Sequence, residues 1–600
     1  MAIPIVPTVA AFLLLSLALY RFIVFPAFIS PLAKIPAAHW SAPFTRLWIL
    51  YYRSREEETP TIHAAHQRLG PIVRVAPNDI SVNSVEGGIR NVYAGGYEKG
   101  DWYQNVFKNY DVMPMFAMPD HGPHSKRKRM LSNIYAKTTL QTSAALSTIT
   151  KVLMEERLTP RLRQVAQSGK PSEFYWLFAS LTSDIVSAYM FGLAQGTDYT
   201  QQPDVSARFF AHYKARQRYQ FWPQDLPSLT RWLGKAGLKW LVVPKWVDEA
   251  NASMQENVLT MCDAAEKVVS EAGDEKGAGN PENWPNVYAQ LRNALLKEQA
   301  TKTDMTGSVE ELVQEQRLAV ASEMLDHLFA GFDTSSISLT FLAWELSKPE
   351  NTVWQEALRN EISTLQDKYD AKAVDSLPLL QAIVQETLRL HAAIPGNQPR
   401  ITPAAATLGA PGHSISDLPP GVRVQAQAWS LHREPSVFPD PENWKPERWL
   451  SPSSPSPVSS PYASEAAYEH AQKEMARWFW AFGSGGRMCV GSNLAMYDMK
   501  AIVVAIWGSF RTTVASDGVR RGDEGMVHRG GEKLATSGSS AVTELSTRSP
   551  MKSDTWSARH GRLLVLHTLF FLESMLHGSE MTAANVLQAS LSTIREIAST

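Results

Sequence analysis

The stretch FGSGGRMCVG, residues 482–491, contains one of only two cysteines in a chain of 600 residues. Four of its ten residues are glycine, and the aromatic run WFWAF (478–482) leads into it. Glycine has no Cβ, so the backbone can approach a bulky group closely at these positions. The composition indicates a loop shaped around something flat and large.

The simplest account of Cys489 is a small buried apolar side chain, the usual fate of an unpaired cysteine. The residues that follow, 490–510, have a helical pattern, which places Cys489 at a helix N-terminus where backbone N–H groups favour a thiolate. No second cysteine or nearby histidine lies at ligand spacing, so a structural zinc site is excluded. A single thiolate is still suited to be the axial ligand of haem iron.

The overall charge gives no indication of a nucleic-acid partner. The chain has 58 Lys and Arg against 59 Asp and Glu, a net charge of −1. Hydrophobic residues make up 44% of the chain, enough for a large buried core. The two cysteines, Cys262 and Cys489, cannot form a disulfide framework, which favours a reducing compartment.

The N-terminus has the composition of a membrane anchor. Residues 3–20 are uncharged and approach the roughly 20 residues needed to cross a bilayer. Positive charges follow this run and none precedes it, which predicts a single-pass anchor over 1–29 with the remaining chain in the cytosol. A buried core helix and a signal peptide are the alternatives. The prolines of 30–43 predict a semi-rigid hinge.

The body of the chain is predicted to be mainly helical with a small β component. Its longest helical pattern runs over 308–348, and two amphipathic helices are expected within 351–369 and 377–393. Strand-like alternation occurs at 72–82 and again at 421–431. We expect one catalytic domain over 44–512.

Three further motifs precede the cysteine loop: AGFDT (330–334), ETLR (386–389) and PERW (446–449). Together and in this order, the four motifs resemble those of the cytochrome P-450 superfamily. Within 482–491 the residues that stand at the positions of its haem-binding signature are Phe482, Gly485, Arg487, Cys489 and Gly491. The resemblance implies the cytochrome P-450 fold with an N-terminal transmembrane helix, haem b as cofactor, and Cys489 as the axial ligand of its iron.

The same resemblance implies a structural network of Glu386, Arg389 and Arg448 that holds the cysteine loop. Glu386 and Arg389 are three residues apart on one helix, so their side chains can pair. A solvated surface pair is the alternative, but the apolar helix around them favours a buried one.

Asp333 and Thr334 are implied to deliver protons during dioxygen activation. The alternative for Thr334 is a hydrogen bond back to its own helical turn.

The resemblance assigns the haem propionates to cations. Arg487 and Arg400 match family positions for this role. His124 and Lys128 match a family H-x-x-x-R pattern in which lysine replaces arginine, so bidentate binding is not expected at Lys128. The alternative for the basic run 126–129 is a solvated patch, which in this family faces the electron donor.

The implied function is insertion of one oxygen atom of dioxygen into an apolar small molecule, by hydroxylation or epoxidation, in terpenoid, polyketide or sterol-like secondary metabolism. NADPH would supply electrons through a membrane-bound NADPH-cytochrome reductase, with cytochrome b5 as an optional donor. The implied location is the endoplasmic reticulum membrane.

Two alternatives stay open. One is a reductase-independent isomerase or dehydratase, although such enzymes often lack the Asp-Thr pair; the other is a non-catalytic haem-binding membrane protein. The second arises because 513–600 departs from the family pattern. That segment is either a divergent extension with the composition of disorder or the product of an altered reading frame.

Overall fold

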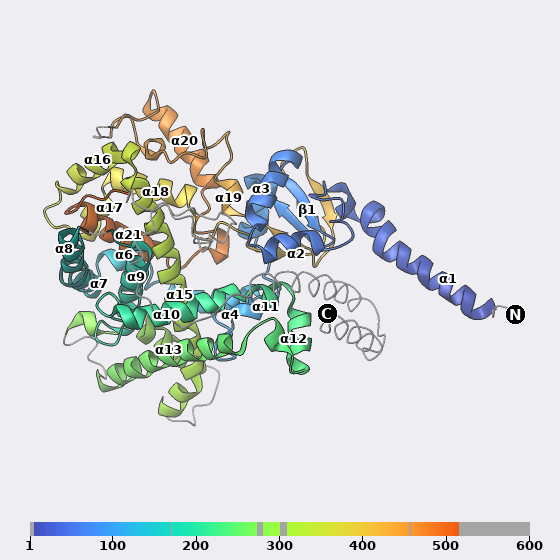
Figure 1. Ribbon diagram of the computed structural model, residues 1–600, viewed down its shortest axis with the longest axis horizontal. Helices are drawn as coiled ribbons and strands as arrows, with labels where there is room; N and C mark the ends of the chain where they lie inside the picture. Colours follow the sequence, from blue (N-terminus) through green and yellow to red (C-terminus); the bar gives the residue numbers. More distant parts are fainter. Residues whose placement is uncertain (1–4, 170, 273–279, 301–308, 455–457, 515–600) are drawn as a thin grey trace, which may run out of the picture.

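The computed structural model describes residues 5–169, 171–272, 280–300, 309–454 and 458–514. The expected extension over 513–600 lies outside these residues except for its first two. The described chain is mainly helical, as expected, with a small sheet lobe on the side from which the N-terminal helix projects (Figure 1).

The α-helices are α1 Ile5–Leu19, α2 Leu47–Ser54, α3 Glu58–Leu69, α4 Gln104–Phe107, α5 His121–Leu131, α6 Lys137–Gln141, α7 Ala144–Lys151, α8 Thr159–Ser168, α9 Phe174–Phe191, α10 Pro203–Arg218, α11 Phe221–Asp225, α12 Pro227–Lys235, α13 Lys245–Ala272, α14 Asn286–Ala300, α15 Val309–Ser347, α16 Thr352–Ile362, α17 Ala371–Asp375, α18 Pro378–Leu390, α19 Ala428–Leu431, α20 Glu465–Trp478 and α21 Ser492–Trp507. Shorter or wider helical turns are η1 Tyr20–Ile29, η2 Pro31–Lys34, η3 Val85–Ala94, η4 Met115–Ala117, η5 Val152–Leu158, η6 Lys239–Leu241, η7 Pro281–Asn283, η8 Pro349–Asn351, η9 Pro446–Trp449 and η10 Gly485–Arg487. The helices expected within 308–348, 351–369 and 377–393 are thus present as α15, α16 and α18.

The main sheet has the strand order β1-β2-β6-β3, formed by β1 Ile72–Ala76, β2 Asp79–Val82, β6 Arg423–Gln425 and β3 Arg400–Ile401. β2 and β6 pair in parallel, with Ile80 opposite Val424, and the other pairs are antiparallel. A second sheet pairs β4 Ala406–Leu408 with β5 Ile415–Leu418.

Two strand predictions need correction. Residues 72–82 are a hairpin, because Pro77 and Asn78 form a turn between β1 and β2. In 421–431 only β6 is a strand, and the chain turns into α19 after Ala426, whose N–H donates to the hydroxyl of Tyr93 instead of to a strand.

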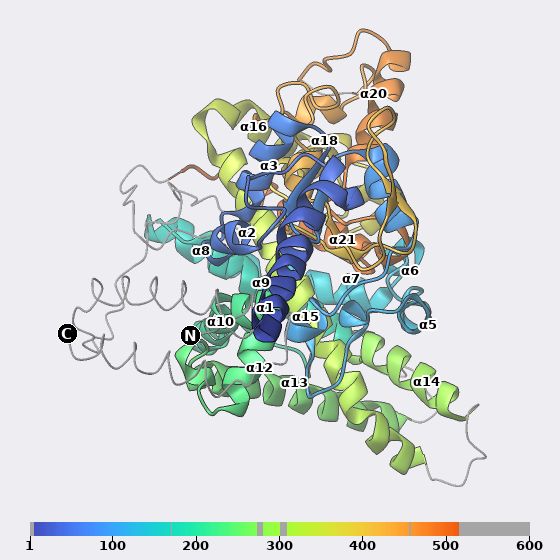
Figure 2. The ribbon, with the colours of Figure 1, turned by 90° about the vertical axis from the view of Figure 1, so that its right-hand side faces the viewer.

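Helix α15 runs through the centre of the helical body and packs against α9, α13, α14 and α18. At Gly331 the helix lies close to α9, and an added Cβ would lie 2.8 Å from a methyl carbon of Val186. A side chain at this position would force Val186 to move. The view of Figure 2 shows α20 and α13–α14 at opposite ends of the body around this helix.

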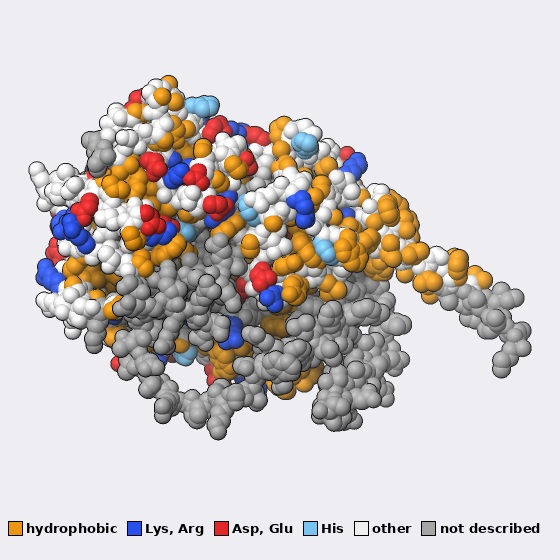
Figure 3. Space-filling model, turned by 45° about the horizontal axis from the view of Figure 1, so that its top comes forward, with side chains coloured by type: hydrophobic (Ala, Val, Ile, Leu, Met, Phe, Trp, Pro, Cys, Tyr) orange, Lys and Arg blue, Asp and Glu red, His pale blue; other side chains and the backbone are white. Residues whose placement is uncertain are grey.

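The helix formed by α1 and η1 contains the one stretch in the described chain long and apolar enough to cross a membrane. It spans Phe12–Ile29 with a mean hydropathy of 2.2, and 6% of it is buried. The space-filling view shows the described part of this helix covered by hydrophobic side chains (Figure 3). The hinge predicted at 30–43 is packed against the body, since Leu32 and Ile35 are buried and the backbone N–H of Arg74 donates to the carbonyl of Pro36 at 2.8 Å.

Candidate active site

The cysteine loop is folded back on itself before α21. The N–H of Cys489 donates to the carbonyl of Phe482 at 3.0 Å, which closes the loop. Gly485 has φ +70°, and an added Cβ would lie 2.2 Å from the carbonyl oxygen of Tyr93. This position therefore tolerates only glycine, for a steric reason that involves a residue almost 400 positions away.

The Cys489 side chain is accessible, although protein surrounds it closely enough that burial raises the pKa of its thiol. The N–H groups of Gly491 and Ser492 and the ammonium of Lys128 act in the opposite direction, but burial outweighs them. The expected stabilisation of a thiolate by the helix N-terminus is present, and by itself it is too weak to ionise the thiol. A bound metal cation would reverse this balance, because a coordinating thiol is deprotonated.

Glu386, Arg389 and Arg448 meet in the core. Both carboxylate oxygens of Glu386 accept from the Arg389 guanidinium, at 2.8 and 2.9 Å, and Arg448 Nε donates at 3.1 Å. The indole N–H of Trp449 and the backbone N–H of Lys445 complete the set at 2.9 and 2.8 Å. The Glu386 and Arg389 side chains are fully buried. The geometry is that of a buried network with its charges satisfied, not of a surface pair.

His432, which the sequence did not single out, connects this network to the cysteine loop. Its Nδ1 donates to the carbonyl of Arg389, and its Nε2 accepts the N–H of Trp480, each at 2.7 Å. The Arg389 guanidinium donates back to the carbonyl of His432 at 2.9 Å. Burial, followed by the charges of Arg389 and Arg433, lowers the pKa of His432 to about 3, which keeps the imidazole neutral in this one tautomer.

Three of the predicted cations lie close to one another. Arg487 donates to the carbonyl of Met118 at 2.7 Å, and Arg400 donates to the hydroxyl of Tyr103 at 2.9 Å. Burial, and next the charge of Arg400, lowers the pKa of Arg487 to about 10. Burial, then Arg487, lowers the pKa of His124 to about 3, and its Nδ1 is buried without a hydrogen-bond partner among the described residues.

Two further residues belong beside this cluster and were missed from the sequence. Lys99 donates to the carbonyl of Phe116, and its pKa lies well below the usual value because of burial and then the charges of Arg400 and Arg487. The ring of Trp102 packs edge-on against Tyr103, and its buried indole N–H has no acceptor in the described chain. A single lysine and a single tryptophan in a loop match no motif, so the sequence gives no signal that they lie beside the predicted propionate-binding residues.

We call Lys99, Arg400 and Arg487, together with the neutral imidazole of His124, the cation cluster. Within the described residues none of the four makes an ion pair with a carboxylate. Burial, and next the positive charges nearby, lowers the pKa of Lys99, His124 and Arg487, and such a position favours an anionic ligand. Two carboxylates on one flat molecule would match this arrangement.

Lys128 has a different set of contacts from the cation cluster, although its charge acts on His124. Its ammonium donates to the loop carbonyls of Gly486 and Met488, at 3.0 and 2.7 Å. Its neighbours in the basic run form ion pairs with other helices, Lys126 with Glu298 and Arg127 with Glu323. Propionate binding by Lys128 stays a prediction, and in this structure the residue braces the cysteine loop.

The acid and the alcohol of α15 have different surroundings. Asp333 is buried, and its Oδ2 accepts from the Tyr213 hydroxyl at 2.8 Å and from the Gln217 amide at 3.1 Å, both on α10. The Thr334 hydroxyl donates to the carbonyl of Ala330 at 2.7 Å, which is the local bond named as the alternative.

One stripe of α15 is accessible while its flanks are buried. The stripe consists of Asp326, Ala330, Thr334 and Ile337, at spacings of four, four and three residues. Such spacings keep residues on one face of a helix. Thr334 therefore lies on the accessible face of this helix rather than in packed protein.

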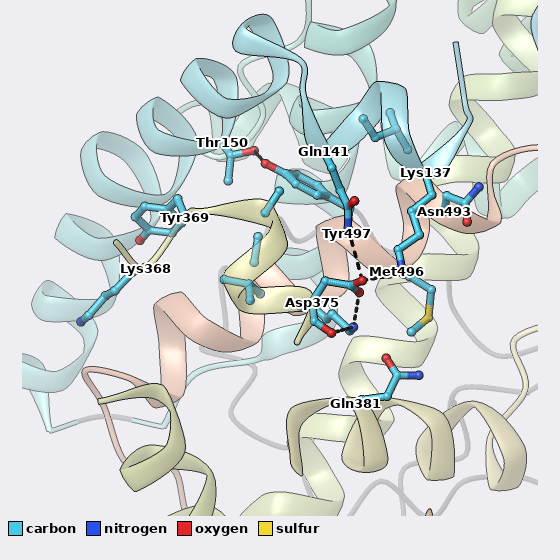
Figure 4. A pocket seen from close by; sticks show the side chains of 15 residues that line it. Lys137, Gln141, Thr150, Lys368, Tyr369, Asp375, Gln381, Asn493, Met496 and Tyr497 are labelled. Atoms are coloured by element: carbon cyan, nitrogen blue, oxygen red, sulfur yellow. Dashed lines mark hydrogen bonds and ion pairs between the residues drawn. The ribbon is translucent and has the colours of Figure 1, made fainter. Parts of the chain in front are cut away.

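A small cavity lies at a different place, among α6, α17 and α21 (Figure 4). Asp375 lies between Lys137 and Lys500 there, with both ammonium groups at 2.5 Å, and the Tyr497 hydroxyl lies 3.1 Å from that of Thr150. None of the predicted site residues lines it, and Asp375 forms ion pairs with two of its lysines.

Comparison with known proteins gives one family. The family model described as Cytochrome P450 matches residues 41–529, which extends past the boundary expected at 512. Among curated proteins the chain is similar to "Cytochrome P450 monooxygenase stcB" of Emericella nidulans, at 28% identity covering 79% of this chain and 81% of that protein. It is similar to "Cytochrome P450 monooxygenase cypX" of Dothistroma septosporum at 26%, covering 82% and 86%, and to "Tryprostatin B 6-hydroxylase" of Aspergillus fumigatus at 25%, covering 86% and 80%.

The family match spans most of the chain, includes all four motifs, and agrees with the mainly helical architecture. The chain belongs to the cytochrome P450 family and is a haem monooxygenase.

Proposed function

We propose that this chain hydroxylates or epoxidises an apolar small molecule in fungal secondary metabolism. Membership of the family implies haem iron and electrons from NADPH through a reductase. The observation that carries the proposal is the cation cluster beside the cysteine loop, because buried like charges without a protein anion fit a ligand with two carboxylates.

The residues present fit haem. Cys489 supplies one accessible sulfur, Gly485 keeps the loop flat against Tyr93, and Arg400 and Arg487 provide guanidinium groups for the propionates. The buried Nδ1 of His124 and indole N–H of Trp102 are further groups that lack a partner in the described protein. Haem ligated by a thiolate supplies the oxidising power to insert one oxygen atom of dioxygen into a C–H or C=C bond.

In this proposal Asp333 and Thr334 manage protons. The Thr334 hydroxyl lies on the accessible stripe of α15, where it can exchange its local bond to Ala330 for one to a water or a reacting group. The Asp333 carboxylate is held by Tyr213 and Gln217, so α10 controls its orientation. Protons that arrive one at a time at this face would make reduction of dioxygen productive.

Membrane binding through two elements is part of the proposal. The apolar helix Phe12–Ile29 would cross the bilayer of the endoplasmic reticulum, with the reductase and cytochrome b5 on the cytosolic side. Trp240, Leu241 and Trp246, near α12, are 53%, 57% and 47% exposed. Figures 1 and 2 show α12 on the side of the body from which α1 projects, so these side chains suit the lipid interface.

The test is expression of the full chain in microsomal membranes with a fungal reductase. The reduced, carbon monoxide-bound protein should show the absorption band specific to thiolate-ligated haem, and Cys489→Ala should abolish it. Absence of this band in the unaltered protein would refute the proposal.

With the band present, Thr334→Ala should keep it while NADPH consumption yields mainly hydrogen peroxide. The exposed Thr138→Ala on α6 is the matched control and should leave the ratio of product to NADPH unchanged.

A further inference from the structure

The loop between η9 and α20 repeats one dipeptide. Ser-Pro occurs six times in the chain, and four of the six fall within 451–461, with the serines at 451, 454, 456 and 460. The other two serines are at 30 and 549. We call the described residues 450–454 and 458–464 the Ser-Pro loop, and they contain no helix or strand. Figure 2 shows α20, which follows this loop, at one end of the body.

A proline directly after a serine has a chemical consequence for enzymes that modify the serine. Proline has no N–H and holds the residue before it in an extended backbone. A kinase pocket that offers no acceptor at this position therefore selects proline, because any other residue would bury an N–H without a partner. In the transfer, the bond from the serine Oγ to the γ-phosphorus of ATP forms and the bond from that phosphorus to the β-phosphate oxygen breaks. ADP leaves, and a carboxylate of the kinase accepts the hydroxyl proton.

The structure separates the Ser-Pro serines by their accessibility. Ser30 is 7% exposed, and its hydroxyl accepts a backbone N–H of η2. Ser460 is held on both sides, since its hydroxyl donates to the carbonyl of Leu450 at 2.8 Å and accepts the N–H of Tyr462 at 3.3 Å. The hydroxyl of Ser451 instead makes its contacts at the surface of the protein. A kinase can therefore reach Ser451 while the chain stays folded.

Ser451 joins the Ser-Pro loop to the first turn of α20. Its hydroxyl donates to Oε1 of Glu465, the first residue of α20, at 2.6 Å. The N–H of Ser453 donates to the same oxygen at 3.1 Å. Hydrogen bonds from Ser451 and then from Ser453 lower the pKa of Glu465, and no cation contributes to this shift. The Glu465 carboxylate is thus held by donors of the loop.

A phosphate on Ser451 would turn this attraction into repulsion. It replaces the donor hydroxyl with acceptor oxygens and a charge of about −1.5 to −2 at pH 7, next to the carboxylate of Glu465. The N-terminus of α20 favours an anion, but it is equivalent to only roughly half a positive charge. The repulsion is therefore the larger effect, and the loop should separate from the helix.

The base of the Ser-Pro loop has contacts that do not involve Ser451. The Tyr462 hydroxyl and the Gln472 amide both donate to the carbonyl of Arg448, at 2.9 and 2.8 Å. Leu450 is 1% exposed. These contacts hold the ends of the loop beside the Glu386 network, so the separation should stay local.

We propose that Ser451 is a phosphorylation site for a proline-directed protein kinase, and that the phosphate releases residues 451–454 from the first turn of α20. The inference goes beyond the proposed function and does not depend on it, because neither haem nor substrate takes part.

The first experiment tests the modification. The detergent-solubilised full chain is incubated with ATP and two purified proline-directed kinases in turn, one of the mitogen-activated and one of the cyclin-dependent class. Mass spectrometry then locates the phosphate. Ser451 should be modified and Ser30 should not, whereas synthetic peptides of the two sites should both be modified.

Pro452→Ala should slow phosphorylation of Ser451 about tenfold, since the alanine N–H is left without an acceptor in the kinase. Pro461→Ala, in the same loop, is the matched control and should leave the rate at Ser451 unchanged. If neither kinase modifies Ser451 in the folded chain, or if Pro452→Ala does not slow the reaction, the site is refuted.

Hydrogen exchange of the phosphorylated chain tests the release. The N–H groups of Ala467 and Tyr468, which donate to the hydroxyl and the carbonyl of Ser464, should exchange about tenfold faster than in the unmodified chain. Exchange in α18 should be unchanged, because the contacts at Arg448 stay in place. Equal exchange in α20 with and without phosphate would overturn the release, and faster exchange in α18 as well would show that the change is not local.

Glu465→Gln removes the negative charge that faces the phosphate, so phosphorylation of this variant should no longer accelerate exchange in α20. Glu469→Gln, an exposed residue one turn further along α20, is the matched control and should keep the acceleration. An acceleration that survives Glu465→Gln would contradict repulsion between Glu465 and the phosphate as its cause.

Discussion

Two buried groups of charge flank the cysteine loop, and they are built on opposite principles. In the Glu386 network one carboxylate accepts hydrogen bonds from two guanidinium groups, an indole and a backbone N–H. In the cation cluster, positive groups lie together without a carboxylate from the described protein. The first group has its counter-charge within the folded chain. Under the proposed function the propionates of haem supply the counter-charge of the second, so the first group would stabilise the fold and the second would bind the cofactor.

The largest effect is expected from Glu386→Gln, which removes the negative charge of the Glu386 network. It would leave Arg389 and Arg448 buried without a counter-charge, which typically destabilises a protein by about 3–5 kcal/mol. We expect loss of the folded holoprotein, measured as yield of the thiolate-haem band and as urea unfolding of the remaining protein. Glu474→Gln, an exposed pair with Arg477, is the control and should behave as the unaltered chain.

A near-normal free energy of unfolding for Glu386→Gln would show that the network does not stabilise the fold.

His432 connects the Glu386 network to the cysteine loop, and substituting it tests whether that connection is needed. His432→Phe removes both hydrogen bonds and keeps the ring stacked on Phe479, whose centroid lies 5.3 Å away. The carbonyl of Arg389 and the N–H of Trp480 would lose partners, at a cost of about 2–3 kcal/mol. The expected result is a lower unfolding midpoint together with a larger share of haem that has lost thiolate ligation.

His432→Gln is the conservative variant, since its amide offers both an N–H donor and a carbonyl acceptor. It should restore part of the thiolate-ligated share. If phenylalanine is tolerated at this position with normal ligation, the link through His432 is not needed.

Arg487→Leu, in the cation cluster, should change the stability of the haem-free protein in the opposite direction from Glu386→Gln. Removing one of several like charges relieves repulsion, so the haem-free protein should unfold at the same or a higher urea concentration. Haem retention should fall about tenfold, because a charge-assisted hydrogen bond to a propionate is lost. Urea unfolding of the haem-free chain and transfer of haem to apomyoglobin measure the two effects.

If Arg487→Leu destabilises the haem-free chain as Glu386→Gln does, the two groups are not different in kind.

The smallest expected effect is on pH dependence. Because the pKa of His124 is lowered from about 6.5 to about 3, the unfolded chain binds more protons than the folded one between these values. Stability of the haem-free protein is therefore lost as the pH falls from about 6.5 toward 3. His124→Gln should make this decline shallower, measured by urea unfolding at a series of pH values.

Bound haem should have the same effect as the substitution, since propionates raise the pKa of His124 toward its ordinary value. An equally steep decline in the haem-free protein, the haem-bound protein and the His124→Gln variant would contradict the assignment.

The helices and motifs could be predicted from the sequence because they depend on residues that are neighbours along the chain. The apolar periodicity of α15, the three-residue spacing of Glu386 and Arg389, and the glycines of the cysteine loop are local features. The ends of the strands were harder to predict, since a turn at Pro77 and the hydrogen bond of Ala426 to Tyr93 decide them. The surroundings of Cys489 were predicted in part: the helix N-terminus is there, but burial raises the pKa of the thiol.

By itself the sequence determined the family, the helical class, the membrane-anchor composition and the motifs from which site residues are predicted, because each rests on residue types at short spacing. Only the tertiary structure decided which cations form the cluster, that Lys128 braces the loop, and that His432 links Arg389 to Trp480. These are contacts between segments far apart in the chain, and their protonation depends on burial that no local pattern encodes.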